Sequence, residues 1–317
     1  MKNPFVTNGY VSPEYFCDRE KETARIVSLL TNENNIALIS PRRLGKTDLL
    51  RHCFGQPEIK EHYHTFIIDI YATSSVRDFV NVFGKAVLDE LRPKGKSVWS
   101  TFLNVLASLR SEITFDMNGQ PTWGIGLGAI TNPSATLDEI FSYLNNAGKP
   151  CLIAIDEFQQ ITKYADDPNI EAALRTHIQR CSNAHFVFSG SHRHLMGAMF
   201  TSPARPFYQS VTLINLPPIS VDKYAEFCLK HFERVSKHLD TLVVTELYER
   251  FNGITSYMQK VMNILFSMTG TGEICIPSMI DTAINDLLDF SADTYDALLY
   301  QMPEKQRIVF MAIAAEG

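Results

Sequence analysis

The chain has 317 residues, of which 45% are hydrophobic and 20% are charged. This composition excludes a chain that is disordered throughout, and it provides enough apolar side chains for one large domain or two of ordinary size. Lys and Arg number 29 and Asp and Glu number 35, so the net charge is −6. An acidic chain is not expected to coat nucleic acid, yet it contains a local basic cluster of Arg42, Arg43, Lys46 and Arg51.

The six cysteines are widely scattered and form no pair with metal-ligand spacing. Isolated thiols of this kind are typical of a reducing compartment. The N-terminal segment lacks the apolar run of a signal peptide, and no run approaches the roughly 18–20 apolar residues of a membrane span. We therefore expect a soluble cytoplasmic protein that has no membrane partner.

Five short apolar runs alternate with helical patterns along the first two thirds of the chain. The predicted strands are 35–40, 66–71, 151–156, 185–190 and 210–216. The predicted helices are 20–31, 45–52, 78–91, 98–110, 136–147 and 169–181. Continuous apolar runs predict strands that are buried on both faces. Their alternation with helices predicts an α/β fold with a parallel five-stranded core sheet.

A change to alternating hydrophobicity predicts a β-hairpin inserted at about 112–128. Asn118-Gly119 marks the turn. The alternating apolar residues on either side of it are Ile113, Phe115, Met117, Trp123, Ile125 and Leu127. The sequence GIGLG lies inside the second of these strands and not between a strand and a helix. We therefore interpret it as part of a strand and not as a nucleotide-binding motif.

The pattern becomes entirely helical after Pro217-Pro218. The later predicted helices include 256–268 and 278–290. Ser278 and Asp281 have the spacing of a capping box at the start of the last of these helices. The predicted divisions of the chain are a core at 1–217, a helical domain at 218–291 and the beginning of a further domain at 292–317.

The most specific motif is SPRRLGKT at 40–47, which joins a predicted strand to a predicted helix. It follows the phosphate-loop pattern GxxxxGK[ST], with Ser40 at the position of the first glycine. In such a loop Gly45 lets the backbone approach a phosphate, Lys46 reaches the β- and γ-phosphates, and the Thr47 hydroxyl ligates Mg²⁺. The candidate nucleotide-binding residues are Pro41, Arg42, Arg43, Leu44, Gly45, Lys46, Thr47 and Asp48. For Arg42 an ordinary solvated side chain is the alternative.

A second motif ends the third predicted strand with Asp156-Glu157. In phosphate-loop proteins such a strand lies beside the strand of the loop, and its terminal Asp holds Mg²⁺. The following Glu can orient the attacking water, so Glu157 and Lys46 are the candidate catalytic residues. Two solvated acids at a strand end are the alternative, which the accompanying phosphate loop disfavours. The glutamate also favours NTP hydrolysis over a small-molecule kinase.

The order and spacing of SPRRLGKTDLL, LIAIDEFQQI and FVFSGSHRHLM resemble those of the archaeal-type predicted ATPases, in the STAND branch of the AAA+-like P-loop NTPases. The resemblance implies a RecA-like core that binds ATP or ADP with Mg²⁺. It also implies that the helical domain at 218–291 is a lid. The segment 292–317 resembles only the first helices of a C-terminal winged-helix domain.

The same resemblance implies roles for residues outside the two motifs. FCDREKE at 16–22 resembles a segment that lies over the adenine, which implies a nucleotide contact for Arg19. FSGS at 188–191 resembles the fourth-strand signature, which implies a γ-phosphate sensor at Ser189 or Ser191. Strand-end caps are the alternative for both serines. Arg193 and Arg205 follow the strand predicted at 185–190. Either arginine could sense the γ-phosphate or reach a neighbouring subunit.

Together these features predict an ATP-binding switch with slow, Mg²⁺-dependent ATPase activity, in which the nucleotide lies between core and lid. Its expected partners are ATP, an unnamed protein and, in a nucleotide-dependent manner, further copies of itself. Two other hypotheses stay open. One is a DNA-binding regulator in which the nucleotide is structural and DNA is held by the winged-helix region. The other is a partner-binding scaffold that binds nucleotide without turnover.

Overall fold

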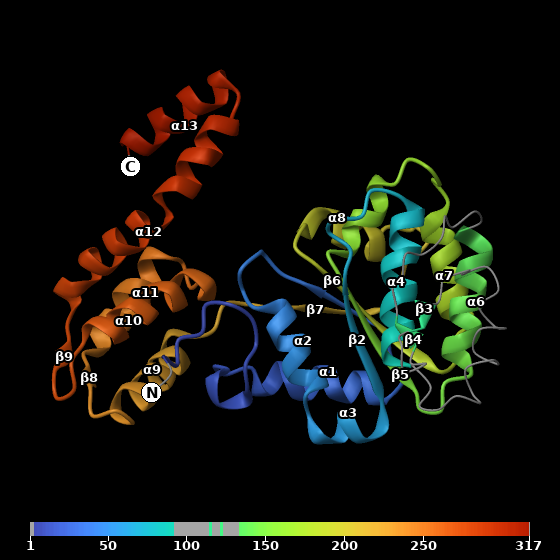
Figure 1. Ribbon diagram of the computed structural model, residues 1–317, viewed down its shortest axis with the longest axis horizontal. Coiled ribbons are helices and arrows are strands. Elements are labelled where there is room, and N and C mark those ends of the chain that lie inside the picture. The colour runs from blue at the N-terminus through green and yellow to red at the C-terminus, as the bar shows by residue number, and fades with distance from the viewer. Residues whose placement is uncertain (1–2, 92–113, 116–120, 123–132, 317) are drawn as a thin grey trace. The chain divides into compact units, whose positions relative to one another are not determined.

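The computed structural model describes residues 3–91, 114–115, 121–122 and 133–316, and the chain divides into two compact units (Figure 1). One unit is Arg19–Pro217, and the other combines Met1–Asp18 with Pro218–Gly317. The first unit ends at Pro217, where the predicted core also ends, but it begins at Arg19 and not at residue 1. The helix predicted at 98–110 lies outside the described residues.

A parallel five-stranded sheet forms the centre of the Arg19–Pro217 unit, as the sequence predicts. The strands are β1 (Ile36–Ile39), β2 (His64–Asp69), β5 (Cys151–Asp156), β6 (Ala184–Gly190) and β7 (Thr212–Asn215). Every neighbouring pair in the order β2-β5-β6-β1-β7 is parallel. All residues of β1, β5 and β6 are buried, because helices pack on both faces of the sheet centre.

The strand order corrects one detail of the prediction. The motif predicts that the strand ending in Asp156 lies beside the strand of the phosphate loop, but β6 lies between β5 and β1. Long crossovers connect these strands, so their order along the chain does not determine which of them are neighbours. Ile39 lies opposite Gly190, and Ile155 lies opposite Phe188. The loops after β1, β5 and β6 therefore leave the sheet at one edge.

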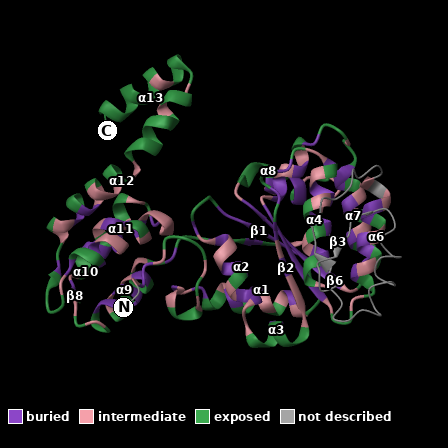
Figure 2. Cartoon of the chain, viewed as in Figure 1, coloured by how far each residue is buried: buried purple, intermediate pink, exposed green. Residues whose placement is uncertain are grey.

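Seven helices and one 3-10 helix are described in this unit. They are α1 (Glu20–Thr31), α2 (Lys46–Phe54), α3 (Pro57–His62), α4 (Val76–Glu90), α6 (Pro133–Asn145), α7 (Ile170–Arg180), α8 (Arg193–Thr201) and the 3-10 helix η2 (Phe158–Lys163). Five agree with predicted helices within a few residues, whereas α3, α8 and η2 are additional. These three have only six to nine residues each, too few to display a clear helical period. Figure 2 shows that buried residues line the strands and the inner sides of the helices.

The core of this unit holds the segment after β5 in place. Phe158, the first residue of η2, is fully buried. Its ring centroid lies 4.4 Å from that of Phe188 on β6 and 5.4 Å from that of Phe207. Aromatic pairs at such separations stabilise beyond the area they bury. The backbone that follows Glu157 is therefore anchored to the core.

The predicted hairpin is present where the structure describes it. Strands β3 (Thr114–Phe115) and β4 (Pro121–Thr122) are antiparallel, with Thr114 opposite Thr122. The rest of the range 112–128, including the glycines, lies outside the described residues.

The second unit is mainly helical and includes the first residues of the chain. Its elements are α9 (Val221–Glu233), α10 (Thr241–Arg250), α11 (Thr255–Met268), α12 (Ile280–Gln301), α13 (Glu304–Glu316), the short strands β8 (His238–Leu239) and β9 (Ile274–Cys275), and the 3-10 helices η1 (Pro13–Tyr15) and η3 (Pro277–Met279). Phe5 is fully buried here, with its ring centroid 6.0 Å from that of Phe227 and 5.7 Å from that of Phe266. This packing explains why residues 1–18 belong to this unit and not to the predicted core.

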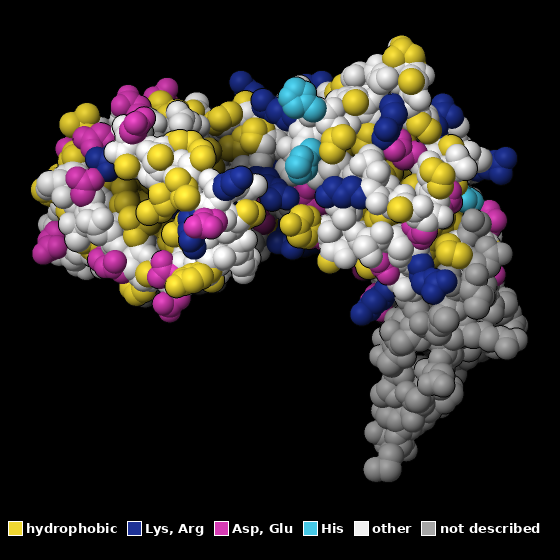
Figure 3. All heavy atoms as spheres, turned by 90° about the horizontal axis from the view of Figure 1, so that it is seen from above, with side chains coloured by type: hydrophobic (Ala, Val, Ile, Leu, Met, Phe, Trp, Pro, Cys, Tyr) yellow, Lys and Arg dark blue, Asp and Glu magenta, His cyan; other side chains and the backbone are white. Residues whose placement is uncertain are grey.

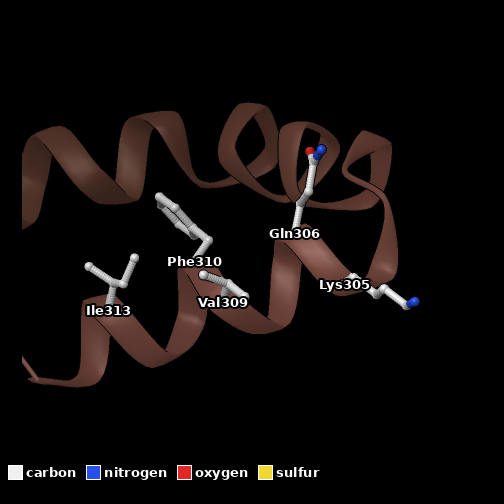
Figure 4. Close-up of a pocket in the computed structure, with 5 residues that line it drawn as sticks. All are labelled: Lys305, Gln306, Val309, Phe310 and Ile313. Atoms are coloured by element: carbon white, nitrogen blue, oxygen red, sulfur yellow. The ribbon is translucent and has the colours of Figure 1, made fainter.

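The C-terminal helices depart from the predicted division. Helix α12 runs through the predicted boundary between 291 and 292. The predicted capping box is not formed, because η3 precedes the helix and Asp281 accepts a hydrogen bond from Arg250 Nη1 at 2.6 Å. A shallow pocket on α13 is lined by Lys305, Gln306, Val309, Phe310 and Ile313 (Figure 4). The assignment of 292–317 to a winged-helix domain stays a prediction. No helix in the described ranges is long and apolar enough to span a membrane.

Candidate nucleotide-binding and catalytic site

The loop between β1 and α2 has the backbone of an anion-binding turn. Arg43 and Gly45 adopt left-handed conformations, with φ of 70° and 84°, and α2 begins immediately afterwards at Lys46. Glycine takes this conformation without the steric penalty of a Cβ. The first N–H groups of a helix have no acceptor within the helix, so the start of α2 after this turn is a place where an anion would be stabilised.

Lys46 lies beneath this loop with only 7% of its surface exposed. Its ammonium donates to the carbonyl of Ser40 at 3.1 Å and to that of Pro41 at 3.3 Å. Burial lowers the pKa of Lys46, and the nearby carboxylates of Asp156 and Glu157 partly oppose that effect. Backbone carbonyls neutralise an ammonium only in part, so this buried cation favours the approach of a phosphate.

Thr47 and Asp156 meet across the sheet edge. The Thr47 hydroxyl donates to Asp156 Oδ2 at 2.5 Å, although 109 residues separate the two in the chain. The other carboxylate oxygen, Oδ1, accepts the backbone N–H of Glu157 at 3.0 Å. Hydroxyl and carboxylate oxygens are the ligand types that Mg²⁺ takes in nucleotide sites. The donor set therefore fits the predicted metal.

Glu157 follows Asp156 in a left-handed conformation, with φ of 53° and ψ of 40°. Such a backbone is unusual for a residue with a side chain and marks a position under constraint. Its Oε2 accepts a hydrogen bond from Gln159 Nε2 at 2.5 Å and another from Ser191 Oγ at 2.9 Å. The carboxylate is thus held from its own loop and from the end of β6.

The two predicted sensor serines have different surroundings. Ser189 is fully buried, and its Oγ has no hydrogen-bond partner among the described residues. Ser191 is partly exposed and contacts Glu157, and it also accepts from Arg42 Nε at 3.4 Å. Arg42 in turn lies 5.6 Å from the ring centroid of Tyr71, at cation–π distance. A chain of contacts therefore links an exposed aromatic residue, Tyr71, to the Glu157 carboxylate.

The structure shows the surroundings of three arginines that the sequence analysis names. Arg19 is buried, and its guanidinium donates to Glu22 at 2.9 Å and to the carbonyl of Pro217 at 2.7 Å. Arg205 forms an ion pair with Glu171, whose pKa burial raises. Arg193 is exposed at the start of α8.

A pocket beside the loop is lined by Pro41, Ser191, His192, Arg193, His194 and Leu195. Figure 3 shows His side chains among Lys and Arg side chains on one face of this unit. Arg43 is exposed on the loop, and Asp48 on α2 pairs with Arg51 at 3.5 Å. The nucleotide contacts named in the sequence analysis, including those of Arg19, Arg43, Asp48 and Arg193, stay predictions.

Sequence reasoning does not single out two residues of the site. Tyr71 follows β2, and the pairing of β2 with β5 brings it to the edge that carries Asp156. Gln159 belongs to the DEFQQ sequence, in which no spacing marks a contact with the glutamate. The left-handed turn at Glu157 into η2 brings the Gln159 amide to the Glu157 carboxylate.

The sequence profile of an ATPase domain found predominantly in Archaea matches residues 16–261. The chain belongs to this family. Its activity is accordingly that of an ATPase, and the phosphate loop, Asp156 and Glu157 all lie within the matched range. A search of curated proteins found no match.

Solved structures share the fold of this ATPase family member at low sequence identity. The Walker-type ATPase PABY2304 of Pyrococcus abyssi is 17% identical, with 94% of this chain and 79% of that chain covered and a TM-score of 0.61. The ORC1 protein of Aeropyrum pernix, solved in complex with DNA, is 12% identical, with 96% and 73% covered and a TM-score of 0.59. The ORC2 protein of the same organism, solved with ADPNP and ADP, is 13% identical, with 90% and 71% covered and a TM-score of 0.60.

Proposed function

We propose that the chain hydrolyses ATP in a Mg²⁺-dependent reaction and that the bound nucleotide sets its conformation. The observation that carries the proposal is the hydrogen bond between Thr47 and Asp156, at the point where Lys46 and Glu157 also converge. Four side chains from two separate motifs thus occupy one site. Each has the chemistry that phosphoryl transfer to water requires.

Each residue has a distinct role in this proposal. The loop N–H groups and Lys46 bind the β- and γ-phosphates. The oxygens of Thr47 and Asp156 hold Mg²⁺, which when bound neutralises charge on the phosphate oxygens. Glu157 orients the attacking water and takes up its proton. Ser189, with a buried hydroxyl that makes no hydrogen bond to the described protein, is the better placed of the two serines to face a phosphate oxygen.

The metal assignment predicts a specific effect of changes at Thr47. We expect Thr47→Val, which keeps the shape but removes the hydroxyl, to weaken binding of ATP in the presence of Mg²⁺ by about tenfold. In EDTA the same variant should bind ATP about as well as the unaltered protein. Thr47→Ser retains the hydroxyl and should restore the Mg²⁺ effect. Equilibrium binding of a fluorescent ATP analogue measures this, and equal loss with Mg²⁺ and with EDTA would contradict the assignment.

The contacts around the loop support a conformational response to nucleotide. A phosphate that engages Lys46 competes with the carbonyls of Ser40 and Pro41, and Mg²⁺ competes with the bond from Thr47 to Asp156. A γ-phosphate adds contacts that ADP does not make. Because ATP and ADP differ in these contacts, they can favour different conformations.

Hydrogen exchange tests this conformational response. In the Glu157→Gln variant, which should keep ATP intact, we expect both nucleotides to slow amide exchange at 40–47 and ATP alone to slow it further at 189–193. Helix α6, which packs against α4 and α7, provides an internal control. Identical exchange with ATP and ADP throughout would contradict the switch.

The proposed location is the cytoplasm. All six cysteines are free thiols and all are buried, which supports a reducing compartment. Nucleotide-dependent self-association, as implied by the STAND-like motifs, is part of the same proposal. Light scattering with ATP and with ADP would detect it.

A further inference from the structure

Gln159 is a buried residue whose side-chain Nε2 contacts the carboxylate of Glu157. Only 4% of the residue is exposed. Its Nε2 donates to Glu157 Oε2 at 2.5 Å, and its Oε1 is buried without a hydrogen-bond partner in the described part of the chain. A buried amide with an unsatisfied oxygen is unfavourable for folding. Its single bond to Glu157 therefore indicates a role in the site and not in stability.

The structure leaves room for this amide at the end of β6. A Cβ built on Gly190 would clash with Gln159 Oε1 and would lie 2.6 Å from Met196 Sδ. The backbone of Gly190 is not left-handed, so its conformation alone does not require glycine. Close approach of the Gln159 side chain is thus one of the two reasons why a larger residue does not fit there.

The geometry of Glu157 shows what this contact achieves. Its left-handed backbone turns the chain sharply after β5, and the buried ring of Phe158 anchors that turn. The side chain still has rotatable bonds that the backbone does not fix. Gln159 and Ser191 donate to the same oxygen, Oε2, and so fix the plane of the carboxylate. Oε1 is then directed away from these two donors.

We propose that Gln159 is a positioning residue for ATP hydrolysis, which holds Glu157 through Oε2 so that Oε1 receives the attacking water. The inference rests on the proposed role of Glu157. In this proposal Gln159 affects the rate through the Glu157 carboxylate, to which its Nε2 donates. Ser191 supplies the second donor and is itself held by Arg42.

The test is the substitution Gln159→Met, which keeps the length of the side chain and removes the donor. We expect kcat to fall about tenfold, as for the loss of one hydrogen bond to a charged group, while KM for ATP and the affinity for ATP stay unchanged. The matched control is Gln160→Met. Gln160 Nε2 donates to the carbonyl of Thr73 at 2.8 Å, and the bond from Gln160 to Glu157 joins backbone atoms that the substitution leaves in place, so this variant should keep kcat.

A double-mutant cycle separates positioning from a general structural effect. In single-turnover reactions with radiolabelled ATP, Gln159→Met should cause no further loss when Glu157 is already glutamine. Equal losses in both backgrounds would overturn the inference, as would an unchanged or a raised kcat in the single variant. Glu157→Gln alone tests the proposed function. A failure of the proposed function can therefore be distinguished from a failure of the inference about Gln159. If Gln159→Met does not fold, Gly190→Ala displaces the same amide by crowding and should show the same fall in kcat.

Discussion

Replacing Glu157 by glutamine is expected to lower the rate of ATP hydrolysis by about 100-fold or more while ATP binding is retained. The amide keeps the size of the side chain but cannot accept the proton of the attacking water. Binding should persist because the loop and Lys46 are unaltered, and both lie on other elements of the sheet edge. Steady-state phosphate release and nucleotide titration measure the two quantities separately.

The matched control for this variant is Glu33→Gln. Glu33 is exposed and also has a left-handed backbone, with φ of 62°, so the control reproduces the same substitution in the same conformation. It should leave turnover unchanged. Unchanged hydrolysis in Glu157→Gln would show that another group activates the water, and the catalytic assignment would then be wrong.

The second large effect is expected from Lys46→Ala, which should abolish measurable ATP binding, a loss of about 100-fold or more. The buried ammonium is the cation placed beneath the loop, and its present contacts are two backbone carbonyls. Its removal leaves the phosphates without the buried cation that would oppose their charge at the loop. Hydrolysis should disappear together with binding, in contrast to the separation expected for Glu157→Gln.

Lys60→Ala is the corresponding control, because Lys60 is an exposed lysine on the short helix α3. The stability of Lys46→Ala should be equal to or above that of the unaltered protein, since a buried charge is removed along with its desolvation cost. Thermal unfolding checks this. Wild-type affinity for ATP in a folded Lys46→Ala variant would exclude the proposed phosphate site.

Most of the fold could be predicted because its signals are local. Runs of apolar residues identify the five parallel strands, and helical spacing identifies five of the helices around them. The position of β6 between β5 and β1 could not be predicted, because strand order depends on packing across long crossovers. That residues 1–18 belong to the helical unit could not be predicted for a similar reason. It depends on where one aromatic side chain, Phe5, finds an apolar partner surface.

Some residues of the candidate site could likewise be predicted from the sequence, and others could not. Lys46, Thr47, Asp156 and Glu157 could be found because each lies in a motif whose spacing reflects direct contact with phosphate, metal or water. Gln159 contacts Glu157 and Tyr71 contacts Arg42, and no short motif marks either residue. Their places follow from the turn after β5 and from the pairing of β2 with β5. The nucleotide contact predicted for Arg19 rests on resemblance, whereas its guanidinium binds Glu22 and Pro217.

The measurement that tests the central claim most directly is phosphate release by the purified chain with Mg²⁺ and with EDTA, made in parallel for the unaltered protein and for Glu157→Gln. We predict steady turnover by the unaltered protein with Mg²⁺, and background rates both in EDTA and in the variant with Mg²⁺. Turnover that persists in EDTA, or at the full rate in Glu157→Gln, would contradict a Mg²⁺-dependent ATPase site built from Lys46, Thr47, Asp156 and Glu157.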